Sequence, residues 1–264
     1  MQLGLTNKTV LITGASQGIG LACAHVFAAE GCHLHLAARN GAAMEQAKAE
    51  IEAKHGVRVT VHQADLASTA AMDALADAAG DSDIVVNNAG DIPAGSLGIV
   101  SDEALRAGFD LKVFGYITLT RAFYARMKGR TSAQGGGVIV NIIGNSGENW
   151  DASYYAGSTG NAALMAFTKA IGGASLNDGV RVVGINPGPV ATARMLKIMK
   201  RKAIDMLGDE ARWEELYDRY PGKRPATSEE VADLTAFLAS PRAGYITGTI
   251  VTIDGGISAR GSVI

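Results

Sequence analysis

Cysteine is scarce in this chain: there are only two, Cys23 and Cys32, and they form no C-x-x-C pair. This excludes a disulfide framework and a cysteine-based zinc site, and we predict no bound metal. Both thiols are expected to be small buried apolar groups in a reducing, cytoplasmic compartment.

Excess charge of one sign is also absent, with 24 Lys and Arg against 26 Asp and Glu and a formal net charge of −2. The balance offers no electrostatic footprint for nucleic acid, so no nucleic-acid partner is expected. No apolar run reaches the ~18 residues of a membrane span, and no signal-peptide pattern is found. We therefore expect no membrane association.

Glycine, in contrast, is abundant, with 33 residues against 6 prolines and no G-X-Y period. Collagen-like and linker interpretations therefore fail. Such glycine usage suits tight turns, or backbone that lies close to a ligand.

Short apolar runs alternate with helix-forming stretches along the chain. Helices are expected over residues 19–30 and 42–55, ended by Gly31 and Gly56. Near-continuous apolar strands between helices predict an α/β fold: one doubly wound domain over residues 1–264, with a mostly parallel seven-stranded sheet covered by helices on both faces. The predicted strands are residues 9–12, 33–38, 57–61, 83–86, 137–143, 180–185 and 249–253.

A glycine-rich turn, T-G-A-S-Q-G-I-G at residues 13–20, links the first predicted strand to the first helix. Glycine in such a turn lets backbone N–H groups approach a pyrophosphate, and the helix N-terminus adds partial positive charge. The strand–turn–helix context favours a nucleotide site over an ordinary turn.

With this turn, the chain resembles the short-chain dehydrogenase/reductase family, whose pattern is T-G-x3-G-x-G. Further motifs follow in the family's order: N-N-A-G at residues 87–90, P-G-x3-T at 187–192, and Y-x-T-G with D-G-G between 245 and 256. The resemblance implies a Rossmann domain that binds a nicotinamide cofactor. The cofactor-binding residues that it implies are Gly14, Ser16, Gln17, Gly18, Ile19, Gly20, Arg39, Asp65, Leu66, Asn88, Ala89, Gly90, Asn161, Pro187, Gly188, Val190 and Thr192.

The end of the second predicted strand bears on the choice of cofactor. An acid there would hold the adenosine 2′-hydroxyl and repel a 2′-phosphate, but Ala38 and then Arg39 stand at this point. A guanidinium can pair with a 2′-phosphate, so NADP(H) is predicted over NAD(H). The glycine-rich turn supplies no second cation, and Arg39 as a merely exposed residue is the alternative.

The family's usual catalytic residues are serine, tyrosine and lysine, with an asparagine on an earlier helix. Counts from several motifs place other residues in these positions: Gly144 for serine, Gly157 for tyrosine, Asn161 for lysine and Lys112 for asparagine. The resemblance therefore points to a divergent member of the family that lacks the usual set.

Tyr154 lies seven residues before Asn161, a spacing similar to that of the family's enoyl-reductase branch. Lys112 could supply the missing cation to Tyr154 or Tyr155, and Asn161 could bond a ribose hydroxyl. We therefore predict Tyr154, Lys112 and Asn161 as catalytic residues. The alternative is that both tyrosines line a pocket or pack, and that Lys112 is a surface lysine. Polar residues of the loop before them could orient substrate: Asn145, Ser146, Glu148 and Asp151.

Three functions stay open from the sequence. The first is an NAD(P)-dependent oxidoreductase that moves hydride between the nicotinamide and a carbonyl, alcohol or enoyl substrate through a rearranged proton donor. The second is a nucleotide-binding sensor or partner subunit without redox turnover. The third is a structural or interaction module.

Apolar side chains dot the charged helical stretch at residues 194–221, the region that folds over substrate in similar family members. They suggest a small-molecule substrate with an apolar part, although a peripheral packing helix is also possible. By resemblance, a homodimer or homotetramer is expected. The apolar residues named for its interface, or equally for the core, are Phe109, Val113, Tyr116, Phe123, Met165 and Ile171.

Overall fold

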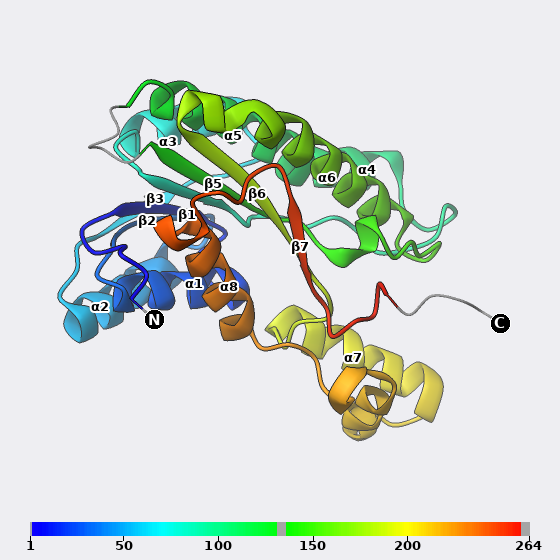
Figure 1. The fold of residues 1–264 in the computed structure, drawn as a ribbon. Helices are drawn as coiled ribbons and strands as arrows, with labels where there is room; N and C mark the ends of the chain where they lie inside the picture. Colours follow the sequence, from blue (N-terminus) through cyan, green and yellow to red (C-terminus); the bar gives the residue numbers. More distant parts are fainter. Residues whose placement is uncertain (1, 131–135, 260–264) are drawn as a thin grey trace.

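Seven parallel strands form one sheet with helices on both faces, in a computed structural model that describes residues 2–130 and 136–259 (Figure 1). The strand order is β3-β2-β1-β4-β5-β6-β7, and every pairing is parallel. The order reverses between β1 and β4, where ligands bind in open α/β sheets. The strands are β1 (Thr9–Thr13), β2 (His33–Ala38), β3 (Val59–Gln63), β4 (Ile84–Asn87), β5 (Gly137–Ile142), β6 (Val180–Pro187) and β7 (Ile250–Ile253).

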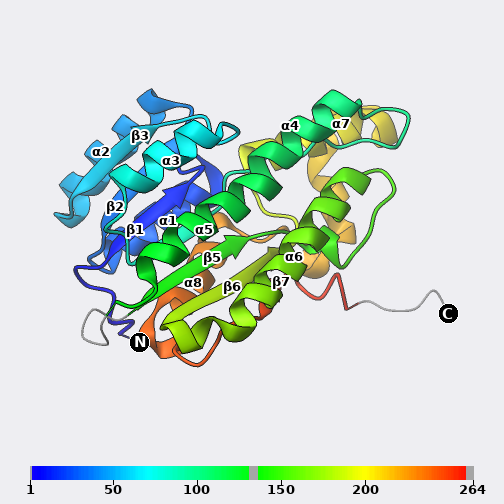
Figure 2. The ribbon, with the colours of Figure 1, turned by 90° about the horizontal axis from the view of Figure 1, so that it is seen from above.

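Helices α1, α2 and α8 cover one face, and α3 to α6 cover the other (Figures 1 and 2). The helix α7 and the turns after it stand off beyond the carboxyl ends of the strands (Figure 1). The α-helices are α1 (Gly18–Ala29), α2 (Gly41–His55), α3 (Thr69–Ala78), α4 (Asp102–Phe109), α5 (Gly115–Met127), α6 (Tyr155–Ser175), α7 (Ala193–Leu207) and α8 (Ser228–Ala239). The shorter turns are the π-helical η1 (Asp110–Phe114) and the 3-10 helices η2 (Asn145–Gly147), η3 (Leu176–Asp178), η4 (Glu210–Arg219), η5 (Pro221–Lys223) and η6 (Pro241–Ala243).

The predicted α/β fold with a seven-stranded parallel sheet is confirmed, and the errors lie at element ends. The third strand starts at Val59 rather than residue 57, because the backbone N–H of Arg58 bonds the His33 ring before the ladder begins. Gly31 is not the cap of α1: Glu30 is the cap, and Gly31 follows it with φ +81°. Gly56 ends α2 as predicted, with φ +67°.

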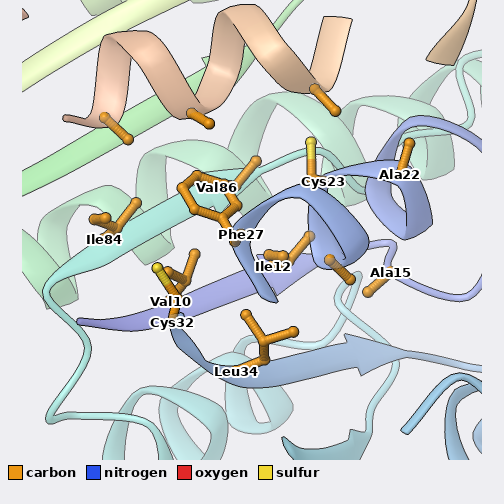
Figure 3. Close-up of a cluster of buried hydrophobic side chains, with 14 of the residues drawn as sticks. Val10, Ile12, Ala15, Ala22, Cys23, Phe27, Cys32, Leu34, Ile84 and Val86 are labelled. Atoms are coloured by element: carbon orange, nitrogen blue, oxygen red, sulfur yellow. The ribbon is translucent and has the colours of Figure 1, made fainter. Parts of the chain in front are cut away.

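The larger apolar core lies between the sheet and helices α1 and α8 (Figure 3). Phe27 of α1 lies in this core with Val10 and Ile12 of β1, whereas Cys23 of α1 points toward α8. Burial raises the pKa of the Cys23 and Cys32 thiols to about 12, so both are inert at neutral pH, as their expected apolar role requires.

The opposite face buries most of the residues considered for a subunit interface. Val113, Tyr116, Phe123 and Met165 are buried within this chain, and Phe109 packs on the same cluster. Only Ile171 of that set is exposed. The five residues other than Ile171 therefore serve the core. Among the described residues, no helix combines the length and the apolarity needed to cross a bilayer.

Arg181 of β6 ties the end of α8 to the sheet. Its buried guanidinium donates to the carbonyls of Leu238, Ala239 and Ser240 at 2.6, 3.2 and 3.0 Å, and to that of Ile246 at 3.3 Å. The last carbonyls of a helix have no partner within it and carry its partial negative charge, so a buried cation is stabilising there.

We predict that Arg181→Met lowers the free energy of unfolding by about 3 kcal/mol, because it leaves buried carbonyls without donors. Urea unfolding followed by circular dichroism measures this, with the exposed Arg242→Met as the matched control. Equal midpoints for the two variants would contradict the capping role.

Candidate cofactor and active site

The turn between β1 and α1 is packed too closely for side chains at its glycines. A Cβ on Gly14 would lie 2.9 Å from Ala89 Cα, and one on Gly20 would meet Gly14 O and lie 2.6 Å from Asn88 Nδ2. Gly14 and Gly18 also have φ of +66° and +56°, which L side chains rarely adopt. The turn therefore packs directly on the segment after β4, with no glycine side chain between them.

The residues after β4 brace the turn. Thr13 Oγ1 accepts from the backbone N–H groups of Asn88 and Ala89 at 2.9 and 3.1 Å. The Asn88 amide in turn donates to the carbonyl of Thr13 at 2.9 Å and that of Gly14 at 3.3 Å. Since β1 and β4 flank the switch point of the sheet, these bonds fix the turn at the predicted site.

The N-terminus of α1 opens toward the same place. Gln17 is its N-cap, makes no capping side-chain bond and is exposed, and no acid stands in the first turn. Ile19 packs on the core. The first N–H groups of a helix have no acceptor within it, so those of α1 can bond a ligand. A pyrophosphate fits this cradle by charge and by shape. Ser16 lies half-buried in the same turn, and Thr192 lies against it: a Cβ on Gly18 would be 3.3 Å from Thr192 Cγ2.

The adenine end of the predicted site lies at the carboxyl ends of β2 and β3. Arg39 directly follows β2 and is exposed, and within the described residues its guanidinium forms no ion pair. Asp65 accepts from the backbone N–H of Ala67, which fixes the turn after β3, and Leu66 is buried.

At the end of β6, Gly188 lies against β7: its N–H donates to the carbonyl of Ile253 at 3.0 Å, and a Cβ on it would be 2.7 Å from Asp254 Cβ. Pro187 ends the strand, and Val190 is buried and bridges to Ala226. This packing directs the chain from β6 to Thr192, whose hydroxyl caps α7.

Lys112 lies in the π-helical turn η1 and is turned inward. Its Nζ donates to the carbonyl of Ile143, at the end of β5, at 2.5 Å. Gly90 makes room for its stem: a Cβ there would be 2.8 Å from Lys112 Cδ. Burial lowers the pKa of Lys112 to about 8, and the charge of Arg194 acts in the same direction. The interpretation of Lys112 as an ordinary surface lysine is therefore wrong.

Asn161 of α6 reaches the same point at the end of β5. Its Nδ2 donates to Ser146 Oγ at 2.8 Å, while its buried Oδ1 has no partner among the described residues. Gly144 has φ +135°, and a Cβ there would lie 2.8 Å from Asn161 Nδ2. A buried acceptor without a donor is costly, so this oxygen suits the hydroxyl of a ligand.

Tyr154, directly before α6, folds back over its own helix. Its ring lies across the place that a Cβ on Gly157 would need. Burial raises the pKa of its hydroxyl, the positive charge of Arg194 lowers it, and Asp91 raises it. Tyr155, in contrast, is the first residue of α6.

The chain matches the family model described as short chain dehydrogenase over residues 8–203. It belongs to this family.

Relatives of the short chain dehydrogenase family align over nearly the whole length. The chain is 33% identical to galactitol 2-dehydrogenase (L-tagatose-forming) of Cereibacter sphaeroides, covering 96% of this chain and 95% of that protein. It is 32% identical to the NADPH-dependent reductase BacG of Bacillus subtilis, covering 96% and 98%. The crystal structure of L-sorbose reductase from Gluconobacter frateurii, complexed with NADPH and L-sorbose, superposes with a TM-score of 0.90 at 33% identity and covers 98% of this chain and 99% of that one.

The polar loop residues that could orient substrate mostly form hydrogen bonds with other groups of the protein. Glu148 accepts from the amide of Asn186 at 2.7 Å, and Asn145 donates to Asp254 at 3.3 Å. Asp151 accepts from the Ser153 backbone and hydroxyl. Ser146 accepts from the amide of Asn161.

An ion pair beside Tyr154 was not expected from the sequence: Arg194 Nη1 lies 2.8 Å from Asp91 Oδ1. Asp91 directly follows the N-N-A-G motif and Arg194 lies two residues after the P-G-x3-T motif, but nothing in a sequence pairs two charges about a hundred positions apart. Only the fold, which brings the ends of β4 and β6 to one edge, joins them.

We predict that Lys112→Met raises the free energy of unfolding by about 2 kcal/mol at pH 7, because the buried ammonium is costly there. The ordinary pKa of 10.5 falls to about 8 in the folded chain, so the unfolded chain binds more protons between these values. The stability of the unsubstituted protein therefore rises with pH across this window, and the advantage of the variant fades.

Urea unfolding at several pH values between 7 and about 10.5 measures the difference, with the exposed Lys169→Met as control. A gap that stays constant over this range, or a variant that is less stable at pH 7, would contradict the prediction.

Proposed function

We propose that this chain is an NADP(H)-dependent oxidoreductase that interconverts a carbonyl compound and its alcohol, with Tyr154, Lys112 and Asn161 in place of the family's usual catalytic residues. The names of its relatives as dehydrogenases and reductases support redox turnover over binding without turnover. An enoyl substrate stays the alternative, since the spacing of Tyr154 and Asn161 is similar to that of enoyl reductases.

One observation carries the proposal: three glycines leave space that three functional side chains fill. Gly157 admits the ring of Tyr154, Gly144 admits the amide of Asn161, and Gly90 admits the stem of Lys112. Gly144 and Gly157 are the positions that the family pattern assigns to serine and tyrosine. In the proposed site, side chains from neighbouring positions would take the place of the usual serine and tyrosine.

The cofactor, when bound, supplies or accepts hydride at the nicotinamide ring. Asn161 Oδ1 would accept a bond from a ribose hydroxyl, which satisfies its unpartnered lone pairs. The hydroxyl of Tyr154 would give its proton to the carbonyl oxygen in reduction and take it back in oxidation.

Burial keeps Tyr154 protonated at neutral pH, which favours its role as the acid in reduction. The ammonium of Lys112 is charged below a pKa of about 8 and would stabilise negative charge that develops on the substrate oxygen.

The preference for NADP(H) rests on Arg39 and on relatives and structural neighbours whose names specify NADPH. A small-molecule substrate with an apolar part is proposed from residues 194–221, where Met199 and Ala203 of α7 pack on Leu216 of η4. A cytoplasmic homodimer or homotetramer, built from a single domain over residues 1–264, stays a prediction. Residues 1, 131–135 and 260–264 of this domain lie outside the described part of the chain.

We predict that Tyr154→Phe lowers the kcat of NADPH-dependent reduction by about 100-fold, because the proton donor is lost, and leaves the Kd of NADPH unchanged. NADPH oxidation is followed by absorbance with a panel of ketoses, including L-sorbose, and of apolar ketones. Tyr155→Phe is the matched control and should change kcat by less than about threefold.

Gly157→Ala is the second arm of this test, because the added methyl group occupies the place of the Tyr154 ring. It should lower kcat to a similar extent with the tyrosine still present. Equal rates in Tyr154→Phe and Tyr155→Phe would overturn the assignment of Tyr154. No NADPH oxidation with any member of the panel would count against the oxidoreductase itself.

We predict that Arg39→Asp weakens NADPH binding by at least about tenfold and reverses the preference toward NADH, because a carboxylate repels the 2′-phosphate and accepts from the 2′-hydroxyl. Fluorescence titration of both cofactors measures the two Kd values. Arg58→Asp, the same charge change at another exposed arginine, is the control. Unchanged Kd values in Arg39→Asp would leave Arg39 as a merely exposed residue.

A further inference from the structure

Residues 91–95, directly after the N-N-A-G motif, are held in place by two helices, and we call this segment the platform. Ile92 is buried, and a Cβ on Gly160 of α6 would lie 2.8 Å from Ile92 Cδ1. On the other side, a Cβ on Gly108 of α4 would lie 2.8 Å from Pro93 Cδ. Helices α4 and α6 therefore pack closely against this segment, at positions where only glycine fits.

The same platform is joined to the chain that carries Tyr154. The N–H of Gly95 donates to the carbonyl of Ser153 at 2.8 Å, and Gly95 forms a parallel bridge with Tyr154. Any group that docks on residues 91–95 is thereby held in fixed relation to the hydroxyl proposed as proton donor.

The helix α7 and the turn η4 form a separate unit beyond the sheet. Met199, Ala203 and Leu216 make an apolar cluster of their own, surrounded by Trp213 and other aromatic residues of the same segment. In Figure 1 this segment lies below the carboxyl ends of the strands, apart from the main layers. Its apolar packing is mainly internal, so its placement over the site depends on other contacts.

Arg194, in the first turn of α7, makes such a contact. Its Nη1 lies 2.8 Å from Asp91 Oδ1, and its Nη2 donates to the carbonyl of Ile92 at 3.0 Å. A cation is unfavourable near a helix N-terminus, so Arg194 does not serve the stability of its own helix. Its two bonds instead fasten α7 to the platform.

We propose that the ion pair between Arg194 and Asp91 is a latch that docks the segment 193–219 on residues 91–95, and that both are positioning residues for the reaction at Tyr154. The second half of this statement rests on the proposed function, and the first half does not. A docked segment excludes water from the site and orients the substrate.

The two charges also act on the proton donor, in opposite directions. Arg194 lowers the pKa of Tyr154 and Asp91 raises it. Other charged groups on the surrounding elements are Lys112 of η1, whose pKa Arg194 also lowers, and Asp151, whose carboxylate is bonded by Ser153. Variants that break the latch from either side should therefore both weaken docking but have opposite effects on the pH profile.

Hydrogen–deuterium exchange of the full chain, without substrate, tests the latch itself. In Asp91→Asn and in Arg194→Gln, amides of residues 193–219 should exchange at least about fivefold faster, because the segment undocks more often. Arg201→Gln breaks the exposed pair with Asp205 on the same helix and should leave exchange unchanged. Unchanged exchange in both latch variants would overturn the proposal, whatever the enzyme activity.

Kinetics with a ketone that the unsubstituted protein reduces test the positioning role. Both latch variants should raise KM. Arg194→Lys keeps the positive charge, so its KM should lie between those of Arg194→Gln and the unsubstituted protein. The alkaline fall of kcat should move to higher pH in Arg194→Gln, since the acid stays protonated longer, and to lower pH in Asp91→Asn. Shifts in one common direction, or none, would reject the effect on Tyr154 even if the exchange result holds.

Discussion

The steric closeness of the turn after β1 to the segment after β4 is the constraint on which the rest of the structure depends. Gly14 and Gly20 have no side chains because Asn88 and Ala89 occupy the space beside them. This contact holds the turn and the N-terminus of α1 at the switch point of the sheet. The proposed cofactor site, and with it the proposed place of reaction, depends on that one close approach.

The reaction site depends on a second kind of close approach, in which glycine at one position permits a side chain from another. Tyr154 lies where a side chain of residue 157 would start, and Asn161 lies against Gly144. In such a site, the location of a functional group in space matters more than the sequence position of the residue that supplies it. The proposed site would in this way hold a hydroxyl, an amide and a cation supplied by Tyr154, Asn161 and Lys112.

The fold was predictable because its signals are local and repeated. Apolar runs such as residues 180–185 can be buried on both faces only in a covered parallel sheet, and all seven strands were found. The error at Val59 arose because a hydrogen bond to a distant residue, His33, precedes the ladder, and the error at Glu30 is a shift of one residue at the end of α1. The family motifs also located the turn at Gly14, whereas they left open whether Lys112 lies inward or at the surface.

Contacts between distant residues were not predictable in the same way. The choice between Tyr154 and Tyr155 as the inward ring depends on the start of α6, which the local pattern does not define. The pairing of Asp91 with Arg194, and that of Arg181 with the end of α8, depend on strand order and on helix placement. Such contacts exist only after the chain has folded, so no spacing rule reports them.

The most direct test of the central claim is isothermal titration calorimetry of the purified chain with NADPH and with NADH. The account predicts saturable binding of NADPH in the micromolar range and weaker binding of NADH, because the bare turn at Gly14 accepts the pyrophosphate and Arg39 favours the additional phosphate. Absence of heat for both nucleotides at millimolar concentration would contradict it.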